Sequence, residues 1–336
     1  SMHFPGQTIF SGPAASVMGS VAFAPTDADA MVLDIGGTTT DIAIIRNRVP
    51  QLHPTGARIA RYRTLIRSLE TRSIGIGGDS VVRITDGKIQ IGPERNGAAM
   101  AYGGPQPTPT DALFVLGKNN GGDRQKAMRG FQTLASATGT DPDTVAWQVF
   151  EHACRSILEE ADSLVERINN RPVYTLHEMQ EESRIRPVHL LVMGGPAVYF
   201  AEQIAKMTDY TVQVVPRAPV ANAIGAALAR TTCDVTLFAD TEIGTALAPE
   251  EDFAQKVGKG FTDRDALQTA TELLKKKARQ MGAVMPNLEI EILENQQFNM
   301  VRGFSTTGKN FRVKLQVKPG LIMDSETVAR RLAGQR

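Results

Sequence analysis

Residues 31–45, MVLDIGGTTTDIAII, contain two apolar segments with a short polar segment between them. The apolar segments are rich in β-branched residues and the centre holds two glycines and three threonines. This pattern predicts a strand, a tight turn and a second strand. Because both segments are continuously apolar, the hairpin is expected to be buried on at least one face. We therefore expect a sheet whose first turn lies at residues 36–40.

This turn is suited to bind an oxyanion, since glycines let the backbone present N–H groups and threonines add hydroxyl donors. The predicted phosphate ligands are Gly36, Gly37, Thr38, Thr39 and Thr40. Asp34 and Asp41 flank the turn, where carboxylates would repel a bare phosphate unless a hard cation such as Mg²⁺ lay between them. The sequence thus favours a magnesium-nucleotide as ligand. The alternative, that both carboxylates only accept hydrogen bonds from the turn, stays open.

Strands and helices alternate further along the chain. Asp141 and Pro142 are a good N-cap and first-turn pair, and apolar spacing predicts a helix over 142–169. Strands are predicted at 188–193 and 211–215, and a helix of small residues at 221–228. This alternation predicts an α/β layered domain.

A second glycine pair, Gly194 and Gly195, lies between the strand at 188–193 and the helix after Pro196. Without side chains, these residues would let a flat purine or ribose lie against the backbone. Many such turns bind no ligand, so the pair gains its significance from its place in the chain, one long α/β crossover after the threonine-rich turn. The segment 71–122 is also rich in glycine and proline, and we expect it to border the active site or an interface.

The pattern of predicted helices and strands changes after residue 232. A capped, charged helix is expected at about 263–281, followed by strands at 288–293 and 311–317. Acidic residues in the first strand and basic residues in the second favour them as sheet neighbours. These residues are Glu289 and Glu291, and Arg312 and Lys314. We predict two domains, an α/β domain over 1–232 and a smaller α+β module over 233–336.

Composition narrows the function classes. The chain has 37 Lys and Arg residues against 36 Asp and Glu residues, so its field gives no reason to expect nucleic acid or an anionic membrane. No apolar run approaches the roughly 20 residues that span a bilayer. The two cysteines have neither the spacing of a metal site nor that of a disulfide framework. Two free thiols in a chain of this length suit a reducing cytoplasm. The signatures of P-loop, dinucleotide, zinc-protease and serine-hydrolase sites are all missing from the sequence.

Several motifs together resemble the hydantoinase A/oxoprolinase family over residues 9–230. They are SGPAASVMGSVAF at 11–23, DIGGTTTDIAII at 34–45, SIGIGGDSVVRI at 73–84, GPQPTPTDALFVLG at 104–117, GGPAVYFAEQIA at 194–205 and APVANAIGAALA at 218–229. The glycine-threonine turn is similar to the second phosphate motif of the acetate kinase, sugar kinase and actin superfamily. The glycine pair resembles the adenosine motif of the same superfamily.

The resemblance implies a ribonuclease H-like, actin-like ATPase fold and an ATP-dependent hydrolase of cyclic amides such as hydantoins or 5-oxoproline. In that chemistry an amide or ketone oxygen, or bicarbonate, is phosphorylated and then attacked. Asp34 and Asp41 would be the catalytic and Mg²⁺-organising residues, and a hydantoinase B-type subunit would be the partner. Candidates for the substrate side are Gly77, Gly78, Asp79 and Asp111. Asp111 could equally cap a helix.

Three alternatives remain open on the same fold. They are a small-molecule kinase, an ATP-dependent carboxylase subunit, and a non-catalytic nucleotide-binding assembly subunit.

The chain departs from the family pattern in two places. Family members usually read GGGS where this chain has GGDS at 77–80, so Asp79 suggests a subgroup with another substrate. Relatives also begin with another lobe bearing a first phosphate motif, whereas 33 residues precede Asp34 here. The resemblance therefore implies that half of the nucleotide cleft lies outside this chain.

Overall fold

The computed structural model describes residues 11–53, 56, 58–59, 62–64, 68–171, 184–285 and 288–334. The chain divides into two compact units. The first unit is Ser1–Leu228 together with Asp324–Arg336, and the second is Ala229–Met323. The sequence pattern predicted the boundary between residues 232 and 233. In the structure the boundary lies between residues 228 and 229, and residues 324–336 belong to the first unit.

The first unit is built on a six-stranded sheet with the order β10-β9-β1-β2-β3, in which β6 also pairs with β2. Its strands are β1 (Asp29–Ile35), β2 (Thr40–Arg46), β3 (Val49–Pro50), β6 (Thr71–Ile74), β9 (Pro187–Met193) and β10 (Thr211–Val214). The expected hairpin is confirmed, because β1 and β2 are antiparallel. β9 and β10 run parallel to β1. Antiparallel strands followed by two parallel ones are the arrangement expected of a ribonuclease H-like domain.

The remaining elements of this unit are helices and two small hairpins. The helices are α1 (Ser11–Val21), η2 (Met100–Tyr102), α2 (Pro109–Val115), α3 (Arg124–Thr138), α4 (Pro142–Asn169), α6 (Ala197–Ile204), η3 (Ala218–Val220), α7 (Ala221–Leu228) and α9 (Ser325–Gly334). The hairpins are β4 (Arg58–Ile59) with β5 (Tyr62–Arg63), and β7 (Val82–Thr85) with β8 (Lys88–Ile91).

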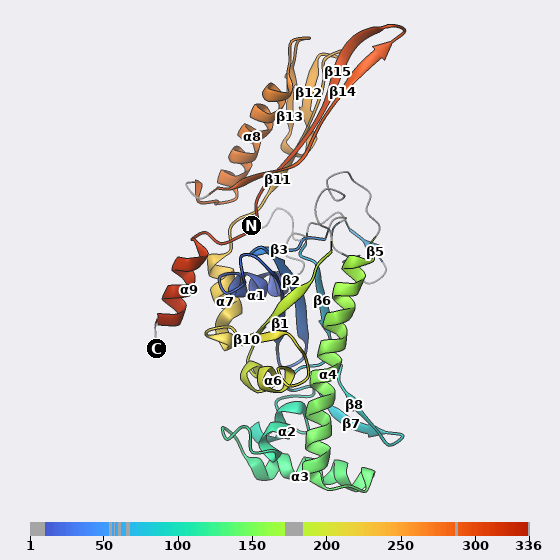
Figure 1. The fold of residues 1–336 in the computed structure, drawn as a ribbon, viewed down its shortest axis with the longest axis vertical. Coiled ribbons are helices and arrows are strands. Elements are labelled where there is room, and N and C mark those ends of the chain that lie inside the picture. The colour runs from blue at the N-terminus through green and yellow to red at the C-terminus, as the bar shows by residue number, and fades with distance from the viewer. Residues whose placement is uncertain are drawn as a thin grey trace. The chain divides into compact units, whose positions relative to one another are not determined.

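Helices cover both faces of the six-stranded sheet, whose central strands contain runs of consecutive buried residues (Figure 1). On the face that carries Asp34, α1 packs against the strands and the hydroxyl of Ser16 donates to the Asp34 carboxylate. On the opposite face, Arg72 of β6 forms an ion pair with Glu160 of α4. α6 packs beside α4 through the edge-to-face rings of Phe150 and Phe200.

Two glycines allow α1 and α7 to approach closely. A Cβ atom on Gly225 of α7 would lie 1.9 Å from the carbonyl oxygen of Ala15, and one on Gly19 of α1 would lie 2.1 Å from the carbonyl oxygen of Ala221. Real Cβ atoms cannot make such contacts, so the helix backbones touch at this crossing. The contact fixes α1, and with it Ser16, against the end of β1.

The long predicted helix is confirmed as α4, whose N-cap Asp141 accepts a hydrogen bond from the backbone N–H of Thr144. Its apolar stripe is buried in the core and includes Cys154, whose pKa is raised by burial. α4 has 28 residues, yet none of the described helices is both long enough and apolar enough to cross a membrane.

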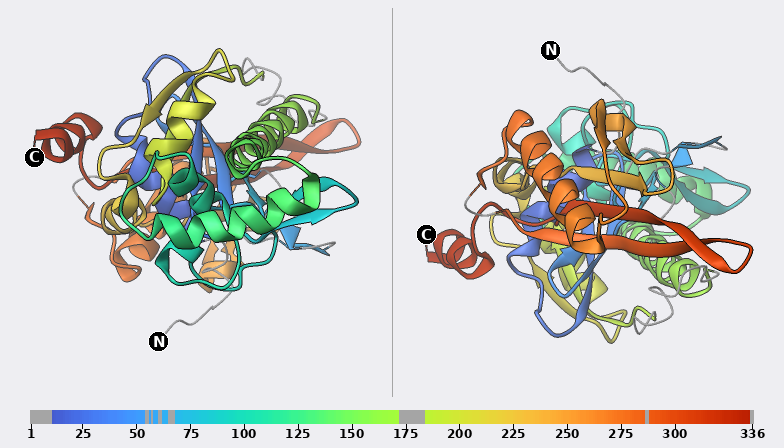
Figure 2. Two further views of the ribbon diagram at one scale, coloured as in Figure 1. Left: turned by 90° about the horizontal axis from the view of Figure 1, so that it is seen from below. Right: turned by 90° about the horizontal axis from the view of Figure 1, so that it is seen from above.

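The second unit is a five-stranded antiparallel sheet with the order β13-β12-β11-β15-β14 and one long helix. Its elements are β11 (Asp234–Asp240), β12 (Thr245–Ala248), η4 (Pro249–Glu251), β13 (Phe253–Lys256), α8 (Asp263–Gln280), β14 (Ile290–Arg302) and β15 (Ser305–Val317). α8 packs through Ala266, Ala270, Leu274 and Ala278 against the buried side chains of the sheet. Figure 2 shows the β14–β15 hairpin extending past the shorter strands.

The two predicted strands of this unit are neighbours, as expected, but their charged residues do not pair as expected. Glu291 lies opposite Gln316, and Arg312 forms an ion pair with Glu294. Lys314 instead lies 3.5 Å from Asp234 of β11. The strands are longer than predicted, and the turn that joins Arg302 to Ser305 sets a register in which Glu291 faces Gln316.

The capping box of α8 provides a first test of the second unit. The hydroxyl of Thr262 accepts from the N–H of Asp265, while the Asp265 carboxylate accepts from the N–H of Thr262. Thr262→Ala is expected to destabilise α8 by about 1 kcal/mol, measured as faster hydrogen exchange of the α8 amides. The control Thr269→Ala, which removes a hydroxyl inside the same helix, should leave exchange unchanged or slower. Equal exchange in Thr262→Ala and the unaltered protein would contradict the prediction.

Candidate nucleotide site

The turn between β1 and β2 carries backbone N–H groups that form no hydrogen bond within the described part of the chain. The carbonyl oxygens of Gly36, Gly37, Thr38 and Thr39 all accept hydrogen bonds from the protein, from Gly78, Asp79, Ser80 and Gly36 respectively. Among the described residues, by contrast, the N–H groups of 37–39 donate to no acceptor. Several free N–H donors on one turn make an anion-binding concavity. The backbone therefore fits a phosphate.

Asp34 and Asp41 lie directly opposite each other on the two strands of this hairpin. Asp34 accepts the hydroxyl of Ser16, whose side chain is buried. Burial raises the pKa of Asp41 above its usual range, a hydrogen bond from Ser73 lowers it, and the Asp34 carboxylate raises it further. Two carboxylates on facing residues of a strand pair repel each other, and a divalent cation between them would relieve that repulsion. The pair fits the predicted Mg²⁺ position.

Thr40 differs from the other two threonines of the turn in its burial. Its side chain is fully buried, and its hydroxyl donates to the carbonyl oxygen of Ile76 at 2.7 Å. As the first residue of β2, it points into the protein, whereas Thr38 and Thr39 remain partly exposed. The Thr40 hydroxyl thus holds the 75–80 segment to the hairpin, and its contact with phosphate stays a prediction.

The glycine-rich segment 75–80 packs directly against the backbone of the turn. A Cβ atom on Gly77 would lie 2.6 Å from the carbonyl oxygen of Gly36, and one on Gly78 would lie 2.7 Å from the Thr110 hydroxyl. Two of the N–H groups that reach the turn carbonyls come from this segment, from Gly78 and Asp79. Gly77 and Gly78 thus have a packing role, and their contact with substrate stays a prediction.

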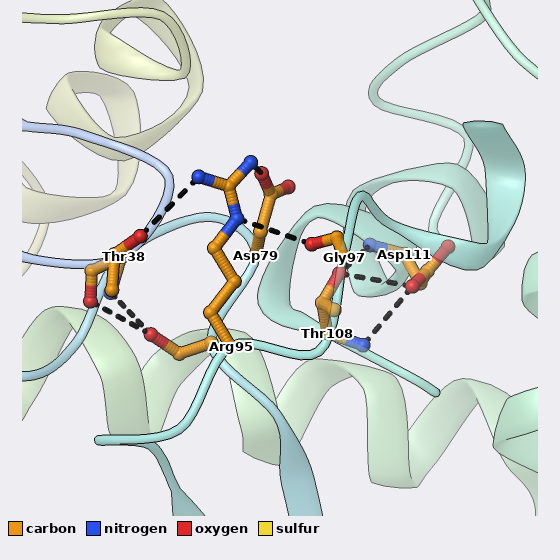
Figure 3. Close-up of polar contacts among 8 residues, drawn as sticks. Thr38, Asp79, Arg95, Gly97, Thr108 and Asp111 are labelled. Carbon is orange, nitrogen blue, oxygen red and sulfur yellow. Dashed lines mark hydrogen bonds and ion pairs between the residues drawn. The ribbon is translucent and has the colours of Figure 1, made fainter. Parts of the chain in front are cut away.

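Asp79 has a partner that sequence reasoning missed. The Arg95 guanidinium donates from Nη2 to Asp79 Oδ2 at 2.7 Å and from Nη1 to the Thr38 hydroxyl at 3.3 Å (Figure 3). Burial raises the pKa of Asp79, while Arg95 and the N–H of Ala99 lower it. Arg95 lies 57 residues from Thr38 in the chain, in a loop whose sequence carries no charge pattern pointing to the turn.

Asp111, the remaining candidate for the substrate side, is wholly buried. Its carboxylate accepts hydrogen bonds from the N–H groups of Met100, Ala101 and Thr108 and from the Thr108 hydroxyl. Thr108 is the N-cap of α2, so the pair forms a capping box. The alternative of a helix cap is thus observed, and a substrate role for Asp111 stays a prediction. Burial raises its pKa, and these hydrogen bonds lower it.

Gly194 and Gly195 lie at the end of β9, beside β1. Gly194 has a φ of +102°, and a Cβ atom there would lie 2.1 Å from the carbonyl oxygen of Ile35 and 3.0 Å from Asp34 Oδ1. Gly195 is exposed and has no heavy atom within 4 Å of a Cβ position. The structure thus brings the second glycine pair next to Asp34, with Gly195 open to a ligand.

This edge of the sheet therefore brings together the free N–H groups of 37–39, the facing carboxylates of Asp34 and Asp41, and the exposed Gly195. The donors suit phosphate oxygens, the carboxylates suit a hard cation, and the glycine leaves room for a flat ring. The strand order of the α/β domain that carries this site is that of the actin-like fold.

Comparison with known proteins identifies the family. Residues 1–235 match the Hydantoinase/oxoprolinase family, so the chain belongs to it. A curated relative, the acetophenone carboxylase gamma subunit of Aromatoleum aromaticum, is 31% identical over 123 residues, which cover 34% of this chain and 17% of the relative.

Two solved structures have similar folds. Nucleotide-free acetone carboxylase has a TM-score of 0.65 at 16% identity and matches 95% of this chain and 50% of its own. The ATP-dependent caprolactamase from Pseudomonas jessenii has a TM-score of 0.58 at 18% identity and matches 91% of this chain and 49% of its own. This chain therefore spans about half the length of these solved relatives. The predicted actin-like α/β fold, with a separate antiparallel sheet in the C-terminal part, is confirmed.

Proposed function

We propose that this chain is the part of an ATP-dependent enzyme that binds Mg-ATP at the β1–β2 turn. The observation that carries the proposal is the open set of N–H groups at 37–39 beside the facing carboxylates Asp34 and Asp41. In this arrangement the turn and the Thr38 and Thr39 hydroxyls hold phosphate oxygens, and the carboxylates hold Mg²⁺. Gly194 and Gly195 border the adenosine. The bound cation would neutralise charge on the transferred phosphate.

The reaction we propose first is ATP-dependent opening of a cyclic amide. Phosphoryl transfer to the amide oxygen would make the carbonyl carbon susceptible to water, and the ring would open with release of ADP and phosphate. Family membership and the similar fold of an ATP-dependent caprolactamase support this reaction.

A second reaction, ATP-dependent carboxylation of a ketone, is supported by the other relatives. One is the gamma subunit of acetophenone carboxylase and the other is acetone carboxylase. A relative that is one subunit of an enzyme also supports the proposed hydantoinase B-type partner.

Product analysis separates the two reactions. The protein, with its partner subunit, is incubated with Mg-ATP and either a cyclic amide, such as hydantoin, 5-oxoproline or caprolactam, or a ketone with labelled bicarbonate. The first proposal predicts ADP, phosphate and an opened ring in equal amounts. Label fixed into a carboxylated ketone would favour the second, and a stable phosphorylated product without ring opening would favour a kinase and contradict both.

Gly195 offers a test of the adenosine position. Gly195→Ala adds a methyl group that meets no heavy atom within 4 Å, so the protein should fold normally. If the adenosine lies against this residue, Mg-ATP affinity should fall by about tenfold, or about 1.4 kcal/mol, in isothermal titration. Gly258→Ala, also in open space, is the matched control and should bind normally. An unchanged affinity for Gly195→Ala would place the adenosine elsewhere.

A further inference from the structure

The Arg95 guanidinium lies directly against the phosphate turn. A Cβ atom on Gly37 would be 2.7 Å from Asp79 Oδ2, 3.3 Å from Arg95 Cζ and 3.4 Å from Arg95 Nη1. The guanidinium thus lies against Gly37, and Figure 3 shows it between Thr38 and Asp79. It is the absence of a side chain at Gly37 that leaves this space for it.

Arg95 retains hydrogen-bonding capacity in this position. Its Nε donates to the Gly97 carbonyl at 3.1 Å, Nη1 to Thr38 and Nη2 to Asp79. A guanidinium has five N–H groups, so one on each terminal nitrogen has no acceptor among the described residues. The side chain is 43% exposed. A permanently charged, planar guanidinium with two free N–H groups can donate hydrogen bonds to the oxygens of a phosphate.

We propose that Arg95 binds the terminal phosphate of the nucleotide and that Asp79 is its positioning residue. The inference rests on the proposed function, since it assigns a contact to a nucleotide held by the same turn. The Asp79 carboxylate anchors one terminal nitrogen and the Gly97 carbonyl anchors Nε, which fixes the plane of the guanidinium. Arg95 thereby brings positive charge to a turn flanked by Asp34 and Asp41.

Nucleotide selectivity distinguishes this role from simple support of the turn. Isothermal titration of Mg-ATP and of Mg-ADP is performed on the full chain with Arg95 intact and with Arg95→Gln. A lost contact to the terminal phosphate should weaken Mg-ATP by about tenfold or more and Mg-ADP by less than about twofold. Asp79→Asn should reproduce part of the same ATP-selective loss.

Arg83→Gln is the matched control. Arg83 is 42% exposed, forms an ion pair with Glu94 and lies on the small β7–β8 hairpin, so its loss should leave both affinities unchanged. Folding is checked by urea unfolding followed through Trp147, the single tryptophan. Should Arg95→Gln fail to fold, Arg95→Lys is tested instead. Lysine keeps the positive charge but lacks the planar guanidinium, so this variant should still lose affinity for Mg-ATP more than for Mg-ADP.

The outcomes are distinct. An equal loss for both nucleotides, or no loss for either, overturns the role of Arg95 while leaving the proposed function intact. Failure of the unaltered protein to bind either nucleotide overturns the proposed function and this inference with it.

Discussion

Asp41→Asn is expected to abolish measurable binding of Mg-ATP. The carboxylate faces Asp34 at the phosphate turn, and an amide is a poor ligand for Mg²⁺. Loss of an outer-shell partner of a metal ligand already costs about 10- to 100-fold in affinity, so loss of this carboxylate should cost at least about 100-fold. Isothermal titration of Mg-ATP measures the change.

The same substitution should stabilise the nucleotide-free protein. Removing one of two like charges that face each other across a strand pair is expected to raise the free energy of unfolding by up to about 1 kcal/mol. A gain in stability combined with a loss of binding would identify Asp41 as a functional rather than a structural carboxylate. Asp29→Asn, at the far end of β1 where Asp29 pairs with Arg46, should leave affinity unchanged. Normal Mg-ATP affinity in Asp41→Asn would contradict the metal role.

Titration of Asp41 adds a pH dependence with a defined sign. Its folded-state pKa is raised, chiefly by burial, so nucleotide-free stability falls as the pH rises from the unfolded-state pKa through the folded-state pKa. Cation binding requires the ionised form, so Mg-ATP affinity should instead rise over the same range and then level off. Asp41→Asn should lose this pH dependence of the nucleotide-free stability.

Asp111→Ala is expected to be the most destabilising single substitution proposed for the first unit. It would leave three backbone N–H groups and one hydroxyl without their acceptor in a fully buried position. Unsatisfied buried donors cost about 1–3 kcal/mol each. With partial relaxation, we expect a total of about 3–5 kcal/mol in urea unfolding followed by Trp147 fluorescence.

Two further variants refine this test. Asp111→Asn keeps the shape but turns an N–H₂ group toward donors, so it should be almost as destabilising as alanine. Asp123→Ala removes the exposed N-cap of α3 and should cost only about 1 kcal/mol. A loss for Asp111→Ala no larger than that of Asp123→Ala would contradict the buried role.

Local patterns in the sequence predicted most of the fold. The β1–β2 hairpin, α4 and its Asp141 cap, and the glycine pair after β9 all depend on residues close together in the chain. Hydrophobic periodicity and capping residues encode such elements directly. The register of β14 and β15 was not predictable, because a two-residue turn at Gly303 and Phe304 and two register shifts along the strands set it.

The site was predictable only in part, for a related reason. Type and spacing placed Gly36, Gly37 and the two aspartates together, since they share one hairpin. Which threonine faces inward depends on strand alternation and on Ile76, which is 36 residues from Thr40. The contacts of Ser16 with Asp34 and of Arg95 with Thr38 join segments distant in sequence. Tertiary packing creates these contacts, and no local pattern specifies them.

The most direct test of the account is a crystal structure of the protein with Mg²⁺ and a non-hydrolysable ATP analogue. We predict phosphate oxygens within hydrogen-bonding distance of the N–H groups at 37–39, Mg²⁺ beside Asp34 and Asp41, and the adenosine against Gly195. A nucleotide bound elsewhere, with the turn occupied only by water, would contradict the assignment of this turn as the phosphate site.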